Sequence, residues 1–235
     1  MENHPVVNRD QWVEERKALL AREKEFTRLR DRLSRQRREL PWVRVDKQYV
    51  FEGANGKQTL SELFAGRHQL IVYHLMYDPS WEEPCSRCSF WADNFNGVLA
   101  HLNQRNVSLV AISRAPLAKL AAFQERMGWS FNWVSSLASD FNQDYGVSFA
   151  PEQLEQGEVI YNYALVKTSM TERPGISVFF KDPTGAIFHT YSCYARGLDM
   201  LNVAYHYLDL TPKGRDEEGL PFPMAWVRYH DAYGT

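Results

Sequence analysis

The sequence predicts an α/β protein in which a central mixed sheet is covered by helices on both faces. Residues 70–76 and 107–113 are nearly continuous apolar runs, which is typical of strands buried on both sides. A helical pattern over 115–127 follows the second run, and two further strands, 176–181 and 186–191, form a hairpin. Strands that alternate with helices predict parallel neighbours within the sheet.

The bulk composition narrows the class of protein further. The chain has 235 residues, of which 44% are hydrophobic, so it can bury a sizeable core. Its net charge of -2 and pI of about 6.4 do not favour nucleic acid as a partner. No apolar run approaches the roughly 18 residues that span a bilayer, and the first residues lack the pattern of a signal peptide. We therefore expect a soluble, cytoplasmic protein that binds neither nucleic acid nor a membrane.

Residues 1–41 are expected to form a helical extension. Asp10 is a plausible N-cap, and Pro41 would end the helix. Its apolar stripe recurs every seven residues, while the other face is densely charged. The stripe consists of Trp12, Leu19, Phe26, Leu33 and Leu40. Such a helix packs against its own domain or against a partner subunit, and a homodimer through this helix is one hypothesis.

The rest of the chain is expected to form one domain over residues 42–211 and a tail over 212–235. Within the domain, the apolar pattern after Cys85 predicts one helix up to about Gln104. Residues 150–174 are polar, so we expect an irregular insertion on the surface. The tail carries few signals of core residues.

The chemistry of the sequence centres on Cys85 and Cys88, which form a C-x-x-C motif where a buried strand leads into a helix. At a helix start the two sulfurs lie close enough for a disulfide. The first cysteine faces the free N–H groups and the positive end of the helix dipole, which stabilise a thiolate and lower its pKa. Arg87 acts in the same direction, whereas Glu82 and Glu83 oppose it.

These positions predict that Cys85 is the attacking thiolate and that Cys88 resolves the mixed disulfide. Pro84 precedes the pair, and Trp81 is an aromatic side chain that could shield the sulfurs. Two alternatives stay open at this point. The cysteines could be structural, or they could bind zinc with two of the three further candidates. Those candidates are Cys193, His189 and His74, but the chain has no second C-x-x-C motif, so we expect neither a metal nor a cofactor.

Several segments resemble the thioredoxin-like superfamily, and in particular its peroxiredoxin-like branch. The thioredoxin fold also places a C-x-x-C at the start of the helix after its central strand, and the lead 56–64 (GKQTLSELF) and the hairpin turn 180–185 (FKDPTG) fit the peroxiredoxin pattern. More closely, the chain resembles a bacterial family of unknown function, the domain-of-unknown-function family eight-nine-nine. That likeness lies in the segments WVRV (42–45), LIVYHLM (70–76), SRAPLAK (113–119), MGWSF (127–131) and YHYLDLTPKGR (205–215).

The resemblance implies a thioredoxin-like fold and a thiol–disulfide oxidoreductase that acts on protein or small-molecule disulfides. It also implies a substrate-docking cis-proline at the start of the strand that faces the cysteines, and Pro174 is the candidate. The alternative is a thiol peroxidase, in which peroxide would oxidise Cys85 to a sulfenic acid. Peroxiredoxins carry threonine three residues before the attacking cysteine, whereas this chain has Glu82. A non-catalytic thioredoxin-like binding module is the third hypothesis.

Overall fold

The computed structural model describes residues 4–234, and the chain divides into two compact units. The first unit ends at Pro41 and the second begins at Trp42. Among the described residues, no helix combines the length and the apolar character that crossing a bilayer requires.

The first unit is a single long helix, α1 (Arg9–Arg38), which ends before Pro41 as the sequence predicts. The prediction that Asp10 is the N-cap is wrong, because Asn8 has this role. The Asn8 side chain accepts a hydrogen bond from the Gln11 backbone N–H at 2.9 Å, and the Gln11 side chain accepts one from the Asn8 backbone. This reciprocal capping box satisfies two N–H groups that a helix start leaves free, which Asp10 would not do from inside the first turn.

The apolar stripe of α1 is exposed. None of the side chains in the helix is buried, and Phe26 is 64% exposed. We propose that this stripe pairs with a second copy of the chain. Replacing Phe26 with glutamate would then place a charge in that interface from each subunit, and we expect the dimer dissociation constant to rise at least about tenfold.

Light scattering over a range of protein concentrations measures this effect in the full chain. Lys24→Glu is the matched control, because it introduces the same residue on the charged face of the same helix. A wild-type mass that corresponds to one chain at every concentration would contradict the pairing.

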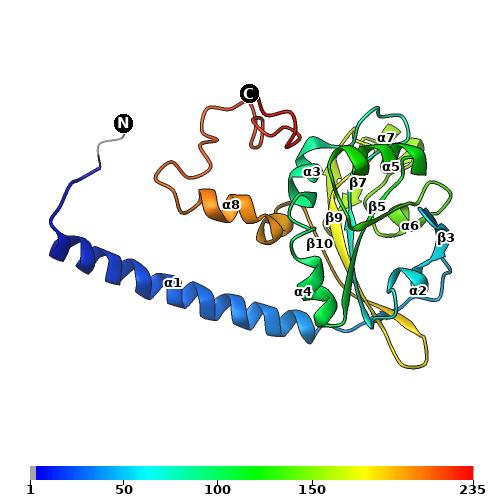
Figure 1. Ribbon diagram of the computed structural model, residues 1–235, viewed down its shortest axis with the longest axis horizontal. Helices are drawn as coiled ribbons and strands as arrows, with labels where there is room; N and C mark the ends of the chain where they lie inside the picture. Colours follow the sequence, from blue (N-terminus) through cyan, green and yellow to red (C-terminus); the bar gives the residue numbers. More distant parts are fainter. Residues whose placement is uncertain (1–3, 235) are drawn as a thin grey trace. The chain divides into compact units, whose positions relative to one another are not determined.

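The second unit is built on an eight-stranded sheet in the order β1-β10-β9-β4-β5-β6-β2-β3 (Figure 1). β4 runs parallel to β5 and antiparallel to β9, while β10 is antiparallel to β9. The strands are β1 (Val43–Arg44), β2 (Val50–Gly53), β3 (Gly56–Thr59), β4 (Gln69–His74), β5 (Val107–Ser113), β6 (Asn132–Ser135), β9 (Gly175–Lys181) and β10 (Ile187–Tyr194).

Helices cover both faces of this sheet. One core cluster joins β4 and β5 to α3, α4, α5 and α8, and a second cluster on the other face joins the same strands to α2 and α6. This arrangement confirms the predicted α/β class and the thioredoxin-like fold. The helices are α2 (Leu60–Leu63), α3 (Ser86–Ala92), α4 (Leu99–Gln104), α5 (Leu117–Arg126), α6 (Phe141–Asp144) and α8 (Val203–Leu208), and a 3-10 helix η1 (Ala195–Leu201) precedes α8.

The single helix predicted from Cys85 to Gln104 is wrong, because the structure has two shorter helices there. α3 ends at Ala92, and Asn94 donates side-chain hydrogen bonds to the carbonyls of Phe90 and Trp91 at 3.0 and 3.1 Å. These bonds satisfy carbonyls that the end of the helix leaves free. The apolar periodicity continues across the break because both helices pack on the same cluster.

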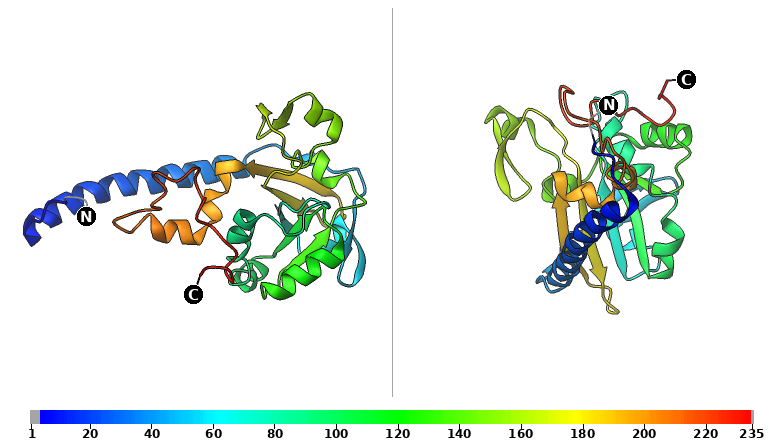
Figure 2. Two further views of the ribbon diagram at one scale, coloured as in Figure 1. Left: turned by 90° about the horizontal axis from the view of Figure 1, so that it is seen from above. Right: turned by 90° about the vertical axis from the view of Figure 1, so that its left-hand side faces the viewer.

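Residues 150–174 are more regular than predicted. They contain α7 (Pro151–Glu155) and a hairpin of β7 (Glu158–Tyr161) and β8 (Ala164–Lys167), which form a separate two-stranded sheet. Asn162 and Tyr163 both adopt positive φ, as a two-residue hairpin turn requires. Figure 2 shows this segment projecting from the main sheet.

The C-terminal segment also packs more tightly than its composition suggests. Val227 is 3% exposed, and Trp226 and Tyr229 pack against the cluster that contains α3. One oxygen of Glu217 accepts hydrogen bonds from the Tyr205 hydroxyl at 2.7 Å and from the Trp226 indole at 2.8 Å. The segment is therefore fastened to α8 and lies against the helix that carries the cysteines.

Candidate active site

Cys85 and Cys88 lie where β4 passes through a loop into α3. The backbone N–H of Cys85 donates to the carbonyl of Met76 at 3.0 Å, which ties the start of the helix back to the end of the strand. Cys85 is the N-cap of α3 and is partly exposed, whereas Cys88 lies within the first turn and is 3% exposed. Both sulfurs are free thiols.

Hydrogen bonds from distant side chains hold the loop before Cys85 in place. The Tyr229 hydroxyl donates to the carbonyl of Pro84 at 2.6 Å, and the Lys119 ammonium donates to the carbonyl of Trp81 at the same distance. The side chain of Trp81 packs against the core cluster that contains Cys88, but it does not line the pocket beside the sulfurs. The structure therefore places Pro84 and Trp81 in the loop that presents Cys85.

The surroundings of Cys85 lower the pKa of its thiol to about 6. The largest cause is a hydrogen bond from the Cys88 thiol, which stabilises the Cys85 thiolate. The backbone N–H of Cys88 and the charge of Arg87 add to this effect, while burial opposes it. The charge of Arg87 thus favours the thiolate form of Cys85.

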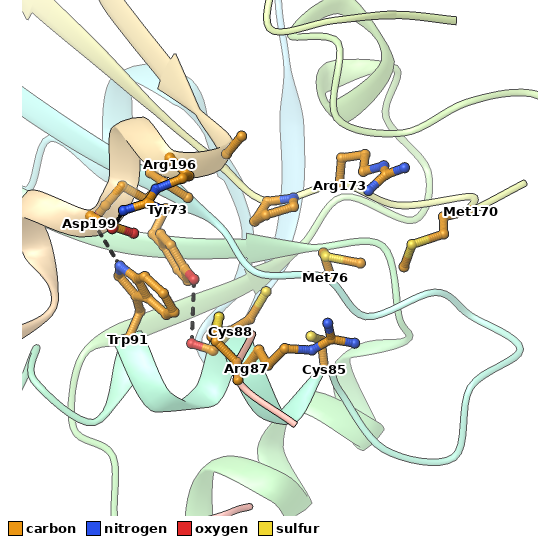
Figure 3. A pocket seen from close by; sticks show the side chains of 14 residues that line it. Tyr73, Met76, Cys85, Arg87, Cys88, Trp91, Met170, Arg173, Arg196 and Asp199 are labelled. Atoms are coloured by element: carbon orange, nitrogen blue, oxygen red, sulfur yellow. Dashed lines mark hydrogen bonds and ion pairs between the residues drawn. The ribbon is translucent and has the colours of Figure 1, made fainter. Parts of the chain in front are cut away.

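Cys88 is shifted in the opposite direction. Its pKa is raised because its proton is held in the hydrogen bond to Cys85, and burial raises it further. The Tyr73 hydroxyl donates to the Cys88 carbonyl at 3.4 Å (Figure 3). The pair therefore consists of an accessible sulfur that ionises readily and a buried sulfur that keeps its proton.

Both sulfurs open into a pocket of about 280 Å³ (Figure 3). Two other predicted site residues, Arg87 and Pro174, line it as well. Its remaining lining residues are Tyr73, Met76, Trp91, Met170, Arg173, Ala195, Arg196, Leu198, Asp199 and Met224.

Pro174 stands directly before β9, the strand that pairs with β4. Every peptide bond of the described residues is trans, so Pro174 does not have the cis geometry that the resemblance implies. Its carbonyl accepts a hydrogen bond from the Tyr161 hydroxyl at 2.7 Å. Gly175 leaves no space for a side chain, since a Cβ there would lie 2.6 Å from the Tyr194 ring. The hydrogen bond from Tyr161 and the close packing at Gly175 together hold Pro174 in the pocket wall.

Several residues of the pocket were not predicted from the sequence. Met170 and Arg173 come from the segment predicted to be an irregular insertion, and Met224 comes from the tail. None belongs to a motif, and no local pattern predicts that these segments meet at the cysteines. The one available signal was the position of Arg173 immediately before Pro174.

The candidate zinc ligands do not come together as a metal site in the described part of the chain. Within residues 4–234, no three side chains of histidine, cysteine, aspartate or glutamate lie together in a way that could hold a metal ion. His74 stacks on Phe141 of the opposite core cluster and bonds to Ser177 at 2.9 Å. His189 bonds to Ser192, whose hydroxyl meets that of Ser177 at 2.8 Å. Both histidines therefore serve a buried polar network.

The fold and the site together define a thioredoxin-like protein with a C-x-x-C pair at a helix start. Residues 1–233 match the model of the family described as "Bacterial protein of unknown function (DUF899)". The chain belongs to this family, as the sequence resemblance predicted. A comparison with curated proteins found no match.

Solved structures of peroxiredoxins share part of the architecture at low identity. The peroxidoxin BcpB from Mycobacterium tuberculosis is 15% identical, with a TM-score of 0.45, over 68% of this chain and 92% of that one. A structure of peroxiredoxin Q from Xanthomonas campestris is 17% identical, with a TM-score of 0.44, over 66% of this chain and 87% of that one. The mitochondrial 2-cys peroxiredoxin from Plasmodium falciparum is 14% identical, with a TM-score of 0.40, over 72% and 92%.

Proposed function

We propose that this protein is a thiol–disulfide oxidoreductase in which Cys85 attacks a disulfide and Cys88 resolves the intermediate. One observation carries the proposal: the partly exposed Cys85 has its pKa lowered to about 6 beside a buried Cys88 whose pKa is raised. A thiolate is the nucleophile in disulfide exchange, so Cys85 supplies the attacking group at neutral pH. Cys88 stays protonated until the second step.

The exchange takes place in two steps. The Cys85 thiolate attacks one sulfur of the substrate disulfide, forms a mixed disulfide with it and releases the other half as a thiolate. The Cys88 thiol then loses its proton to solvent or to the departing thiolate and attacks the Cys85 sulfur. This step forms the Cys85–Cys88 disulfide and releases the second half of the substrate. The substrate has gained two electrons, and a cellular dithiol returns two electrons to the protein.

The chemistry that we propose needs neither a metal nor an organic cofactor, because the two sulfurs carry both electrons. The substrate is a protein or a small-molecule disulfide. We also propose that the protein works in the cytoplasm, a reducing compartment in which a close cysteine pair serves redox chemistry rather than structure.

Thiol alkylation across a range of pH tests the proposal. We expect one thiol of the fully reduced protein to react fast, with an apparent pKa of about 6, because the Cys85 thiolate is already formed at neutral pH. This fast phase should disappear in Cys85→Ser. It should persist in Cys193→Ser, the matched control, because Cys193 is buried and does not line the pocket.

The titration also distinguishes the oxidoreductase from the two alternatives, a non-catalytic binding module and a thiol peroxidase. If all thiols react slowly and alike, Cys85 is not activated, and a non-catalytic binding module becomes the better interpretation. If Cys85 is activated but the protein consumes peroxide and leaves disulfides intact, the activity is that of a peroxidase. The side chain of Glu82, which replaces the threonine of peroxiredoxins, is exposed and does not line the pocket.

A further inference from the structure

The pocket at the cysteines carries positive charge that the protein leaves uncompensated. Arg87 lies beside Cys85, and Arg173 lies across the pocket, beyond Met76 (Figure 3). The Arg87 guanidinium rests over the Phe222 ring at 5.1 Å, and Arg173 donates to the Thr168 hydroxyl at 2.7 Å. Throughout residues 4–234, no carboxylate forms an ion pair with either arginine.

Two acidic groups near the pocket already have ion-pair partners. Asp199 is the one acidic side chain among the described residues that line the pocket, and it pairs with Arg196 at 3.0 Å and with Arg215 at 3.1 Å. Glu83, in the loop before Cys85, pairs with Arg126 at 2.6 Å. Among the described residues that line the pocket, Arg87 and Arg173 are therefore the charged side chains without an ion pair.

The buried part of Arg173 has an unmet hydrogen bond. Its Nε is shielded from solvent and has no partner in the structure. A buried donor without a partner is uncommon in folded proteins. Arg173 is partly exposed and adjoins Pro174 in the pocket wall, so a ligand with an acceptor would bind the accessible part of the guanidinium rather than this shielded nitrogen.

The rest of the lining is largely apolar and includes three methionines. Met76, Met170 and Met224 come from three separate segments of the chain, and Trp91 and Leu198 also line the pocket. Methionine side chains are flexible and polarisable, and they fit ligands of varied shape. The volume of about 280 Å³ lies near the lower end of the roughly 300 to 1,000 Å³ of small-molecule sites.

We infer that the pocket binds small disulfides that combine an apolar body with carboxylate groups, and that Arg87 and Arg173 are the residues that bind the anion. This inference rests on the proposed function and deepens it by naming the substrate class. The carboxylates pair with the guanidinium groups, while the apolar body lies on the methionines beside the Cys85 sulfur. The redox step is the exchange already described.

Two chromogenic disulfides of opposite character test the inference. Dithiobis(nitrobenzoate) is aromatic and carries carboxylates, whereas dithiodipyridine is aromatic and neutral. The measured quantity is the rate constant of the fast phase with reduced protein, assigned to Cys85 by its loss in Cys85→Ser. We expect Arg87→Gln and Arg173→Gln each to lower the ratio of the anionic to the neutral rate by about fivefold, and the double variant by about twentyfold.

Arg87 also lowers the pKa of Cys85, so its replacement changes the fraction of thiolate. This change affects the rates with both disulfides alike and cancels in their ratio. Arg105→Gln is the matched control, because it removes an equal charge from the exposed end of α4, outside the pocket, and should leave the ratio unchanged. Added salt should slow the anionic disulfide and not the neutral one. An unchanged ratio in the double variant would overturn the inference while leaving the proposed function intact. If neither disulfide reacts with Cys85, the proposed function itself fails.

Discussion

The Cys85→Ser variant is expected to lose disulfide reduction altogether, with a fall in kcat/KM of at least about 1,000-fold. A serine hydroxyl stays protonated at neutral pH and cannot form the mixed disulfide, so neither Cys88 nor Arg87 can compensate. The fold should survive the change, because the side chains are close in size and Cys85 is partly exposed. Turnover of a disulfide with a chemical dithiol as the reductant measures the effect.

The Cys88→Ser variant should fail at a later step. Its Cys85 still attacks, but no second sulfur releases the product, so the mixed disulfide accumulates to one equivalent. The mass of the intact protein should increase by half of the substrate, and reduction should remove the added mass. The serine hydroxyl replaces the thiol whose hydrogen bond contributes most to the low pKa of Cys85, so the first attack should persist at neutral pH. Equal residual turnover in both variants would contradict the division of roles.

The placement of the two cysteines could be predicted from the sequence because it depends on local geometry. A buried strand, a short loop and a helix start place one cysteine at the N-cap and the other within the first turn, and these elements are found at β4 and α3. The continuous apolar runs at β4 and β5 likewise predict strands with helices on both faces. In these segments the residues near one another in the chain decide the structure.

The lining of the pocket could not be predicted from the sequence, because it depends on which distant segments of the chain come together. Met170 and Met224 reach the cysteines from the segment that follows a hairpin and from the C-terminal segment. Apolar periodicity predicts that a side chain is buried, but it does not predict its partner. The break between α3 and α4 was missed for a related reason, since the side-chain bonds of Asn94 end the first helix while the apolar pattern continues.

Nothing in the sequence indicated a buried acid at Glu172 either. It is 1% exposed and immediately precedes Arg173 and Pro174 in the pocket wall. The Ser148 hydroxyl donates to one of its oxygens at 2.6 Å and the Arg114 guanidinium to the other at 3.1 Å. Burial raises the pKa of Glu172 from 4.5 to about 7, and these two partners only partly offset it.

Such a carboxyl makes the protein less stable as the pH rises. The folded state holds the Glu172 proton more tightly than the unfolded chain does, because the pKa is higher in the folded state. Its contribution is therefore fully present below about pH 4.5 and is lost as the pH rises through about 7. Each pKa unit corresponds to about 1.4 kcal/mol, so the free energy of unfolding should fall by roughly 3 kcal/mol over this range from this group.

Glu172→Gln removes the titration and keeps a side chain that can accept and donate hydrogen bonds. We expect the free energy of unfolding of the wild type, relative to this variant, to be lower at pH 8 than at pH 5 by up to roughly 3 kcal/mol. Denaturant unfolding at the two pH values measures both proteins, and the comparison cancels groups that titrate alike in each. Glu152→Gln, an exposed change on α7, is the control and should keep the pH dependence of the wild type. If the free energies of unfolding of the wild type and of Glu172→Gln differ by the same amount at both pH values, Glu172 is ionised in both states at both pH values. Arg114 would then stabilise the buried carboxylate. In that case the ion pair, rather than a neutral acid, fixes the segment that carries Arg173 and Pro174 at the cysteines.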